Sequence, residues 1–132
     1  MINRIMLFFV SFCLLAAMVN CGNSSATQQI FQDDQNEIQV KKGEIFKIIL
    51  PSNIGTGYSW ELQAPLDSTY LKFVDKEYIE NDLMTEEEES REIWRFQAFK
   101  KGQSTIQMIY KRPWEKVSED AKERQFEVSI SE

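Results

Sequence analysis

Histidine is the first side chain to consider for chemistry, and the chain of 132 residues has none. Its absence removes the usual general base, the usual zinc ligand and every Ser-His or Cys-His nucleophile pair. Carboxylates are plentiful, but nothing in their spacing indicates the facing pair that a glycosidase needs. The four Glu at residues 86–89 lack the alternating spacing and the Gly turn of a calcium loop. We therefore expect a protein that is not an enzyme and that has neither a cofactor nor a metal site.

Residues 53–60 read Asn-Ile-Gly-Thr-Gly-Tyr-Ser-Trp and have the composition of a binding loop. Gly55 and Gly57 allow backbone angles that are closed to other residues, and they leave no side chain to block a partner. Asn53 can hydrogen-bond its own backbone at the start of the turn, and Thr56 offers a hydroxyl at the tip. A narrow loop of this kind can enter a slot in another protein. The alternative is a hairpin turn that only connects two strands.

Residues 111–115 read Lys-Arg-Pro-Trp-Glu and place a cation, a rigid Pro and an indole side by side. Pro113 restricts Arg112 to extended angles, so Trp114 is held at a defined place with little entropy left to lose. Trp and Arg are also the residue types found most often as interface hot spots. The alternative is that Trp114 covers the end of the core. Because binding residues concentrate on loops of a rigid scaffold, both segments are candidates for a binding site.

Strand-like sequences flank both segments. Seven runs are strand-like: apolar and polar residues alternate in most of them, whereas residues 70–78 are rich in β-favouring residues. Lys42-Gly43 and Lys101-Gly102 are turn signals between some of these runs. The sequence predicts no long helix, so the pattern favours an all-β fold, either a small sandwich or a barrel. Residues 115–122 are charged enough to form a helical turn or an exposed loop. The predicted strands cover residues 37–41, 45–50, 58–62, 70–78, 91–99, 105–110 and 124–130.

The apolar face of these runs is expected to form the hydrophobic core, since side chains two apart point to the same side of a strand. The core should hold the fold without help from disulfides. The residues that share the inward face are Phe46, Ile48, Leu50, Trp94, Phe96, Ala98, Ile106, Met108, Tyr110, Phe126, Val128 and Ile130.

The first twenty residues have the layout of a secretory signal peptide. Asn3 and Arg4 precede an apolar run that ends near Val19 and is short for a membrane span. Cys21 stands where the run ends, and a Cys at this junction resembles the lipidation site of bacterial lipoproteins. Cys13 would be removed with the signal, which leaves no internal disulfide. The alternative is a buried N-terminal strand or helix.

These features divide the chain into a signal peptide over residues 1–20, a flexible tether over residues 21–36 and one domain over residues 37–132. The formal net charge of −6 disfavours nucleic acid, which needs a basic surface. We expect export to the periplasm or the cell envelope, or secretion. A lipid on Cys21 would be the chain's contact with a membrane.

At its two loops the chain resembles the chagasin-type inhibitors of papain-like cysteine peptidases. In that family the first loop reads Asn-Pro-Thr-Thr-Gly followed by an aromatic residue, and the last loop carries Arg-Pro-Trp. Ile54 and Gly55 depart from the first motif. Residues 93–96 resemble the strand after the family's middle loop, and the resemblance spans residues 37–130. The positions that match the two motifs and their surroundings are Asn53, Thr56, Gly57, Tyr58, Trp60, Arg112, Pro113 and Trp114.

The resemblance implies an immunoglobulin-like β-sandwich of about seven or eight strands that reversibly inhibits papain-like cysteine peptidases. The first loop would sit over the catalytic Cys without offering a scissile bond in a productive pose. Trp114 would pack on an apolar wall beside the cleft, and Arg112 would add a charge or cation–π contact. The residues implied to bind the peptidase are Asn53, Ile54, Gly55, Thr56, Gly57, Tyr58, Arg112, Pro113 and Trp114.

The middle loop departs from the family's pattern. The family has Gly-x-Gly-Gly there, whereas residues 85–90 read Thr-Glu-Glu-Glu-Glu-Ser. Glycines would allow backbone pairing with a peptidase, so their loss puts that contact in doubt. Glu88, Glu89 and Ser90 are candidates for a secondary contact only.

Two other functions stay open on the residues alone. A carbohydrate-binding module would use Trp60, Trp114 and Tyr58 as platforms on which sugar rings stack. A non-inhibitory lipoprotein would instead form part of an envelope assembly. Retained glycan binding without inhibition would favour the first of these, and capture of envelope proteins without a peptidase would favour the second.

Overall fold

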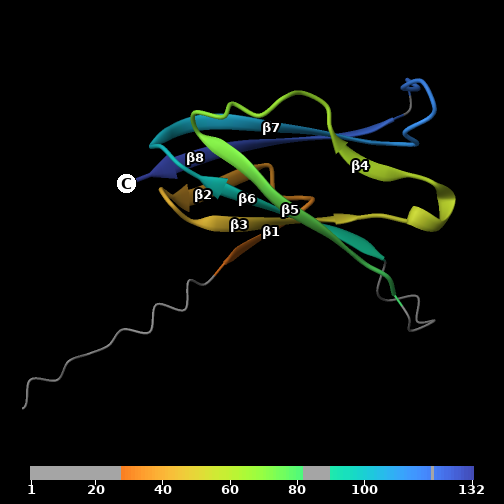
Figure 1. The fold of residues 1–132 in the computed structure, drawn as a ribbon, viewed down its shortest axis with the longest axis horizontal. Helices are drawn as coiled ribbons and strands as arrows, with labels where there is room; N and C mark the ends of the chain where they lie inside the picture. The colour runs from red at the N-terminus through yellow and green to blue at the C-terminus, as the bar shows by residue number, and fades with distance from the viewer. Residues whose placement is uncertain (1–27, 82–89, 120) are drawn as a thin grey trace, which may run out of the picture.

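Two four-stranded β-sheets pack face to face in a sandwich (Figure 1). The structure is a computed structural model that describes residues 28–81, 90–119 and 121–132. The expected all-β fold is confirmed, and the fold is a sandwich rather than a barrel. The strands are β1 (Gln29–Gln32), β2 (Glu37–Lys41), β3 (Ile45–Pro51), β4 (Ser59–Leu62), β5 (Leu71–Ile79), β6 (Arg91–Ala98), β7 (Gly102–Lys111) and β8 (Lys122–Ser131).

The strand order is that of an immunoglobulin-like sandwich. One sheet has the order β1-β3-β6-β5, which corresponds to the order A-B-E-D of immunoglobulin domains. The other has the order β2-β8-β7-β4, in which β8, β7 and β4 correspond to G, F and C, and β2 is a further strand beside G. β1 pairs in parallel with β3, and β2 pairs in parallel with β8. The remaining pairs are antiparallel. The resemblance therefore implied the correct fold class.

The core forms where the apolar faces of the two sheets meet. The alternation that predicted the strands is visible in β3, where every second side chain is buried, and in β8 from Phe126 to Ile130. Burial of these apolar side chains is the main favourable term in folding. Tyr110 is only partly buried, although the sequence placed it among the core residues. Core residues contributed by the sheets include Ile38, Val40, Phe46, Ile48, Leu50, Trp60, Trp94, Phe96, Ala98, Ile106, Met108, Phe126, Val128 and Ile130.

The ordered domain begins earlier than the sequence indicated. Residues 21–36 were expected to be a tether, but Gln29–Gln32 form β1 and pair with β3. Phe31 of this strand packs edge-on against Phe46 with ring centroids 6.1 Å apart. The described part of the chain between β7 and β8 has no helix, so residues 115–119 form an exposed loop rather than a helical turn.

The chain path brings two loops to one end of the sandwich. The connection from β3 to β4 crosses from one sheet to the other, and the connection from β7 to β8 joins neighbouring strands of the second sheet. β4 pairs with the end of β7, with Ser59 opposite Lys111. Figure 1 shows both connections at the end opposite the C-terminus. Residues far apart in sequence can therefore meet there.

Candidate functional site

The first loop, residues 53–58, is a tight turn held by its own backbone. Ile54–Thr56 form one turn of 3-10 helix, and Gly57 ends it with a φ of 84°. Gly57 thus uses a backbone angle closed to other residues, whereas Gly55 does not have a positive φ. The carbonyl of Asn53 accepts from the Thr56 amide at 3.1 Å and from the Thr56 hydroxyl at 2.6 Å, and the carbonyl of Ile54 accepts from the Gly57 amide at 2.8 Å.

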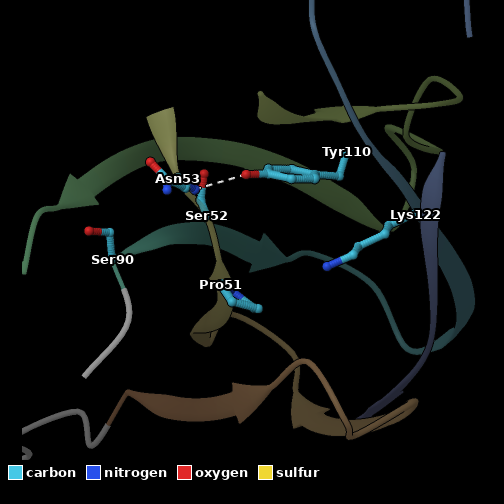
Figure 2. A pocket seen from close by; sticks show the side chains of 6 residues that line it. All are labelled: Pro51, Ser52, Asn53, Ser90, Tyr110 and Lys122. Carbon is cyan, nitrogen blue, oxygen red and sulfur yellow. Dashed lines mark hydrogen bonds between the residues drawn. The ribbon is translucent and has the colours of Figure 1, made fainter. Parts of the chain in front are cut away.

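The start of this loop is fixed differently from the prediction. The side chain of Asn53 makes no capping hydrogen bond. Instead, the Asn53 amide donates to the hydroxyl of Tyr110 at 2.8 Å, as the dashed line in Figure 2 shows. A tyrosine from β7 thus does what an Asn side chain does in a common turn. Sequence reasoning missed this partner because it lies 57 positions away.

The last loop, residues 112–115, presents an exposed indole. Trp114 is 72% exposed, which contradicts the alternative that it covers the end of the core. A backbone hydrogen bond of 3.1 Å from the Glu115 amide to the Arg112 carbonyl closes the turn around Pro113. An exposed Trp on a closed turn has lost little area to folding and can still lose it to a partner.

Arg112 joins the last loop to the first. Its Nε donates to the carbonyl of Thr56 at 3.0 Å, and its guanidinium lies 4.6 Å from the ring centroid of Tyr58. It also pairs with Glu115 at 3.0 Å, and this hydrogen bond raises the pKa of Arg112 above its ordinary value. These contacts hold the guanidinium in place within the protein, and its expected contact with a partner stays a prediction.

Gly57 and Trp114 also meet. A Cβ atom at Gly57 would lie 2.6 Å from Cη2 of Trp114 and 3.0 Å from its Cζ2. The indole therefore rests against the bare backbone of the first loop. Gly57 serves two needs, since it adopts a left-handed backbone and leaves room for the ring. The two predicted segments thus form one surface, which we call the paired loops (residues 53–58 and 112–115).

Three aromatic side chains pack in series from the first loop into the core. Tyr58 stacks on Tyr110 with centroids 5.4 Å apart, and Tyr110 lies 5.1 Å from Trp60. Trp60 is 1% exposed, and its indole donates to the carbonyl of Pro51 at 2.9 Å. A Trp buried in this way cannot act as a surface platform, so the sugar-stacking role considered for Trp60 is wrong.

Sequence reasoning missed a buried carboxylate beneath the first loop. Glu92 is 2% exposed and accepts hydrogen bonds from the Ser52 hydroxyl at 2.7 Å, the Trp60 amide at 3.1 Å and the Trp94 indole at 3.0 Å. A signal for it existed, since Glu92 lies two residues before Trp94 on the predicted inward face of its strand.

Of the three residues expected to make a secondary contact through the middle loop, Ser90 lies within the described part of the chain. Glu88 and Glu89 lie outside the described residues. Ser90 is partly buried, its carbonyl accepts from the Ser52 amide at 2.9 Å, and its hydroxyl accepts from the Asn81 amide at 3.1 Å. Ser90 therefore helps to hold the strands at this end of the sandwich.

A pocket of about 290 Å³ opens beside the base of the first loop. Figure 2 shows its lining of Pro51, Ser52, Asn53, Ser90, Tyr110 and Lys122. The polar groups of this lining are the hydroxyls of Ser52, Ser90 and Tyr110, the side-chain amide of Asn53 and the amine of Lys122. Over residues 28–81, 90–119 and 121–132, no group of three or more acidic, Cys or His side chains could hold a metal ion.

Comparison with known proteins identifies the family. The profile of the chagasin family peptidase inhibitor I42 matches residues 39–130. Amoebiasin-2 of Entamoeba histolytica is 27% identical over 130 residues, which cover 92% of this chain and 97% of that protein. The crystal structure of the cysteine protease inhibitor EhICP2 from Entamoeba histolytica has a TM-score of 0.62 at 23% identity and covers 77% of this chain and 93% of its own.

A further similar structure is that of PbICP-C in complex with falcipain-2, with a TM-score of 0.53 at 18% identity over 78% of this chain and 99% of its own. The similarity to these two solved structures supports the fold. The profile match supports the family, because it covers more than half of the chain. Sandwich, motif-bearing loops and profile agree. The chain belongs to the chagasin family of peptidase inhibitors.

Proposed function

We propose that the protein reversibly inhibits papain-like cysteine peptidases by placing the paired loops in the active-site cleft. The observation that carries this proposal is the exposed Trp114, which rests against Gly57 at the tip of the first loop. Because the paired loops are already held together before binding, they lose little conformational entropy when they bind, and this favours affinity. The first loop would lie over the catalytic Cys, and Trp114 would pack against an apolar wall of the cleft.

The backbone of the first loop is poorly suited to cleavage. The carbonyls of Asn53 and Ile54 accept hydrogen bonds within the loop, and the carbonyl of Thr56 accepts from Arg112. A scissile carbonyl must instead be free to meet the donors of an oxyanion hole at about 3 Å. These three carbonyls are therefore not free to enter the oxyanion hole when the loop occupies the cleft.

Titration of papain with the purified domain, residues 28–132, tests this function. We expect competitive inhibition that is reversed by dilution, and no effect on a serine peptidase of the trypsin type. Thr56→Trp adds bulk at the tip of the first loop, at an exposed residue, and should abolish most of the inhibition while circular dichroism stays unchanged. Full papain activity in a large molar excess of the parent domain would contradict the proposal.

The two other functions receive less support. Burial of Trp60 leaves Tyr58 and Trp114 for sugar stacking, and Tyr58 is already covered by Tyr110 and Arg112. The family assignment favours an inhibitor over a protein that only joins an envelope assembly. A contact of Glu88, Glu89 and Ser90 with the peptidase stays a prediction.

We also propose that residues 1–20 direct export and that Cys21 carries a lipid. This part of the chain lies outside the described residues, and the support is the apolar run followed by Cys21. No helix within the described residues is long and apolar enough to cross a membrane. Since β1 begins at Gln29, a tether would be confined to the residues between Cys21 and this strand.

A Cys21→Ser change tests the lipid anchor in the full chain. We expect the parent to sediment with membranes and the variant to move to the soluble fraction, because the acyl chains supply the affinity for the bilayer. Intact-mass analysis of the parent should show added acyl mass. A parent whose mass equals that of the bare polypeptide would rule the anchor out.

A further inference from the structure

Glu92 is buried at a position where an apolar side chain would be the ordinary choice. It lies on β6, in register with Leu50 of β3, and 2% of it is exposed. Burying a carboxylate is costly unless it is hydrogen-bonded or paired. None of the ion pairs found in the described residues includes Glu92, and its three partners are neutral donors. Stability alone therefore does not account for a carboxylate here, since apolar replacements of buried charges are often as stable.

Two of the three donors flank the first loop. Ser52 precedes the loop and Trp60 follows it, and both donate to the same oxygen, Oε1 of Glu92. Trp94, on the same strand as Glu92, donates to Oε2 and so fixes the orientation of the carboxylate. Because β3 and β4 belong to different sheets, Oε1 ties the sheets together at the point where the loop crosses between them.

We propose that Glu92 is a positioning residue for the first loop, an inference that rests on the proposed inhibitory function. Its carboxylate holds the two ends of the loop together and thereby fixes the position of the loop relative to Trp114, which Gly57 contacts. A charged acceptor suits this role because hydrogen bonds to a carboxylate are shorter and stronger than those to a neutral group. Glu92 itself touches no peptidase.

Glu92→Gln is the first variant, because it keeps the shape but has only one acceptor oxygen for donors that now meet two. We expect the inhibition constant for papain to rise about tenfold, which corresponds to about 1.4 kcal/mol. Ser52→Ala removes one donor and leaves the carboxylate in place, so a rise of about threefold is expected. Ser52→Ala also serves as the second variant if Glu92→Gln does not fold.

Ile130→Ala is the matched control for lost stability, since Ile130 is buried at the C-terminal end of β8, away from the loops. It should lower the melting temperature at least as much as Glu92→Gln and change the inhibition constant less than twofold. Equal inhibition constants for Glu92→Gln and the parent would overturn the proposal. So would a loss of inhibition that simply follows melting temperature across the three variants.

Hydrogen exchange separates this inference from the inhibitory function. Glu92→Gln should speed exchange of the Gly57 and Trp60 amides about tenfold, and should leave the Ile106 amide in the middle of β7 unchanged. Unchanged exchange at Gly57 and Trp60 would show that Glu92 does not hold the loop. If the parent fails to inhibit papain, the proposed function is wrong, and exchange at these amides still decides the role of Glu92.

Discussion

Trp114→Ala is expected to weaken inhibition of papain about thirtyfold or more and to leave the melting temperature nearly unchanged. The indole is 72% exposed, so little of its area contributes to folding. Truncation of a hot-spot Trp costs about 2 kcal/mol or more of binding free energy, which is about thirtyfold in affinity. Inhibition constants and thermal melts of the same preparations measure the two effects separately.

Trp60→Ala provides the opposite case within the same chain. Trp60 is 1% exposed in the core, and loss of a buried Trp costs about 3–5 kcal/mol of folding free energy. We expect a large fall in its melting temperature, in contrast to Trp114→Ala. If Trp114→Ala melts as early as Trp60→Ala, or inhibits as well as the parent, Trp114 does not act as an exposed anchor.

The fold could be predicted because its signals are local. Alternation in β3 and β8 fixes which side chains point inward, whatever the partner strands are. β1 was missed because four residues, two of them Gln, are too few to show a period. Its place beside β3 depends on packing of Phe31 against Phe46, which no local pattern indicates.

The site could be predicted as two loops but not as one surface. Gly57 and Trp114 were singled out by residue type, and the structure brings them into contact. What could not be predicted is the hydrogen bond from Arg112 to Thr56, since it joins positions 56 residues apart and requires both sheets to be in place. The same is true of Tyr110 and the Asn53 amide. The motifs identify the residues, whereas the packing of the two sheets determines which of these residues contact each other and which remain exposed to a partner.

Gly57→Ala is expected to weaken inhibition about thirtyfold, through two separable causes. The φ of 84° is a left-handed conformation that costs Ala about 1 kcal/mol relative to Gly. The new Cβ would also lie 2.6 Å from Cη2 of Trp114, so the indole must move from its place against the loop. The displaced ring then meets the cleft in the wrong position. Inhibition constants for papain measure the combined effect.

Two further variants separate the causes. Gly43→Ala imposes a similar strain, with a φ of 87°, but its Cβ would meet nothing within 4 Å. Gly43 lies in the turn between β2 and β3, at the far end of the sandwich from the paired loops, so this variant should lose stability and keep its inhibition. In a Trp114→Ala background the ring is absent, so Gly57→Ala should add much less than thirtyfold, because contacting residues are not additive. If Gly57→Ala costs the same in both backgrounds, the contact between Gly57 and Trp114 does not set the position of the indole, and the two loops act independently.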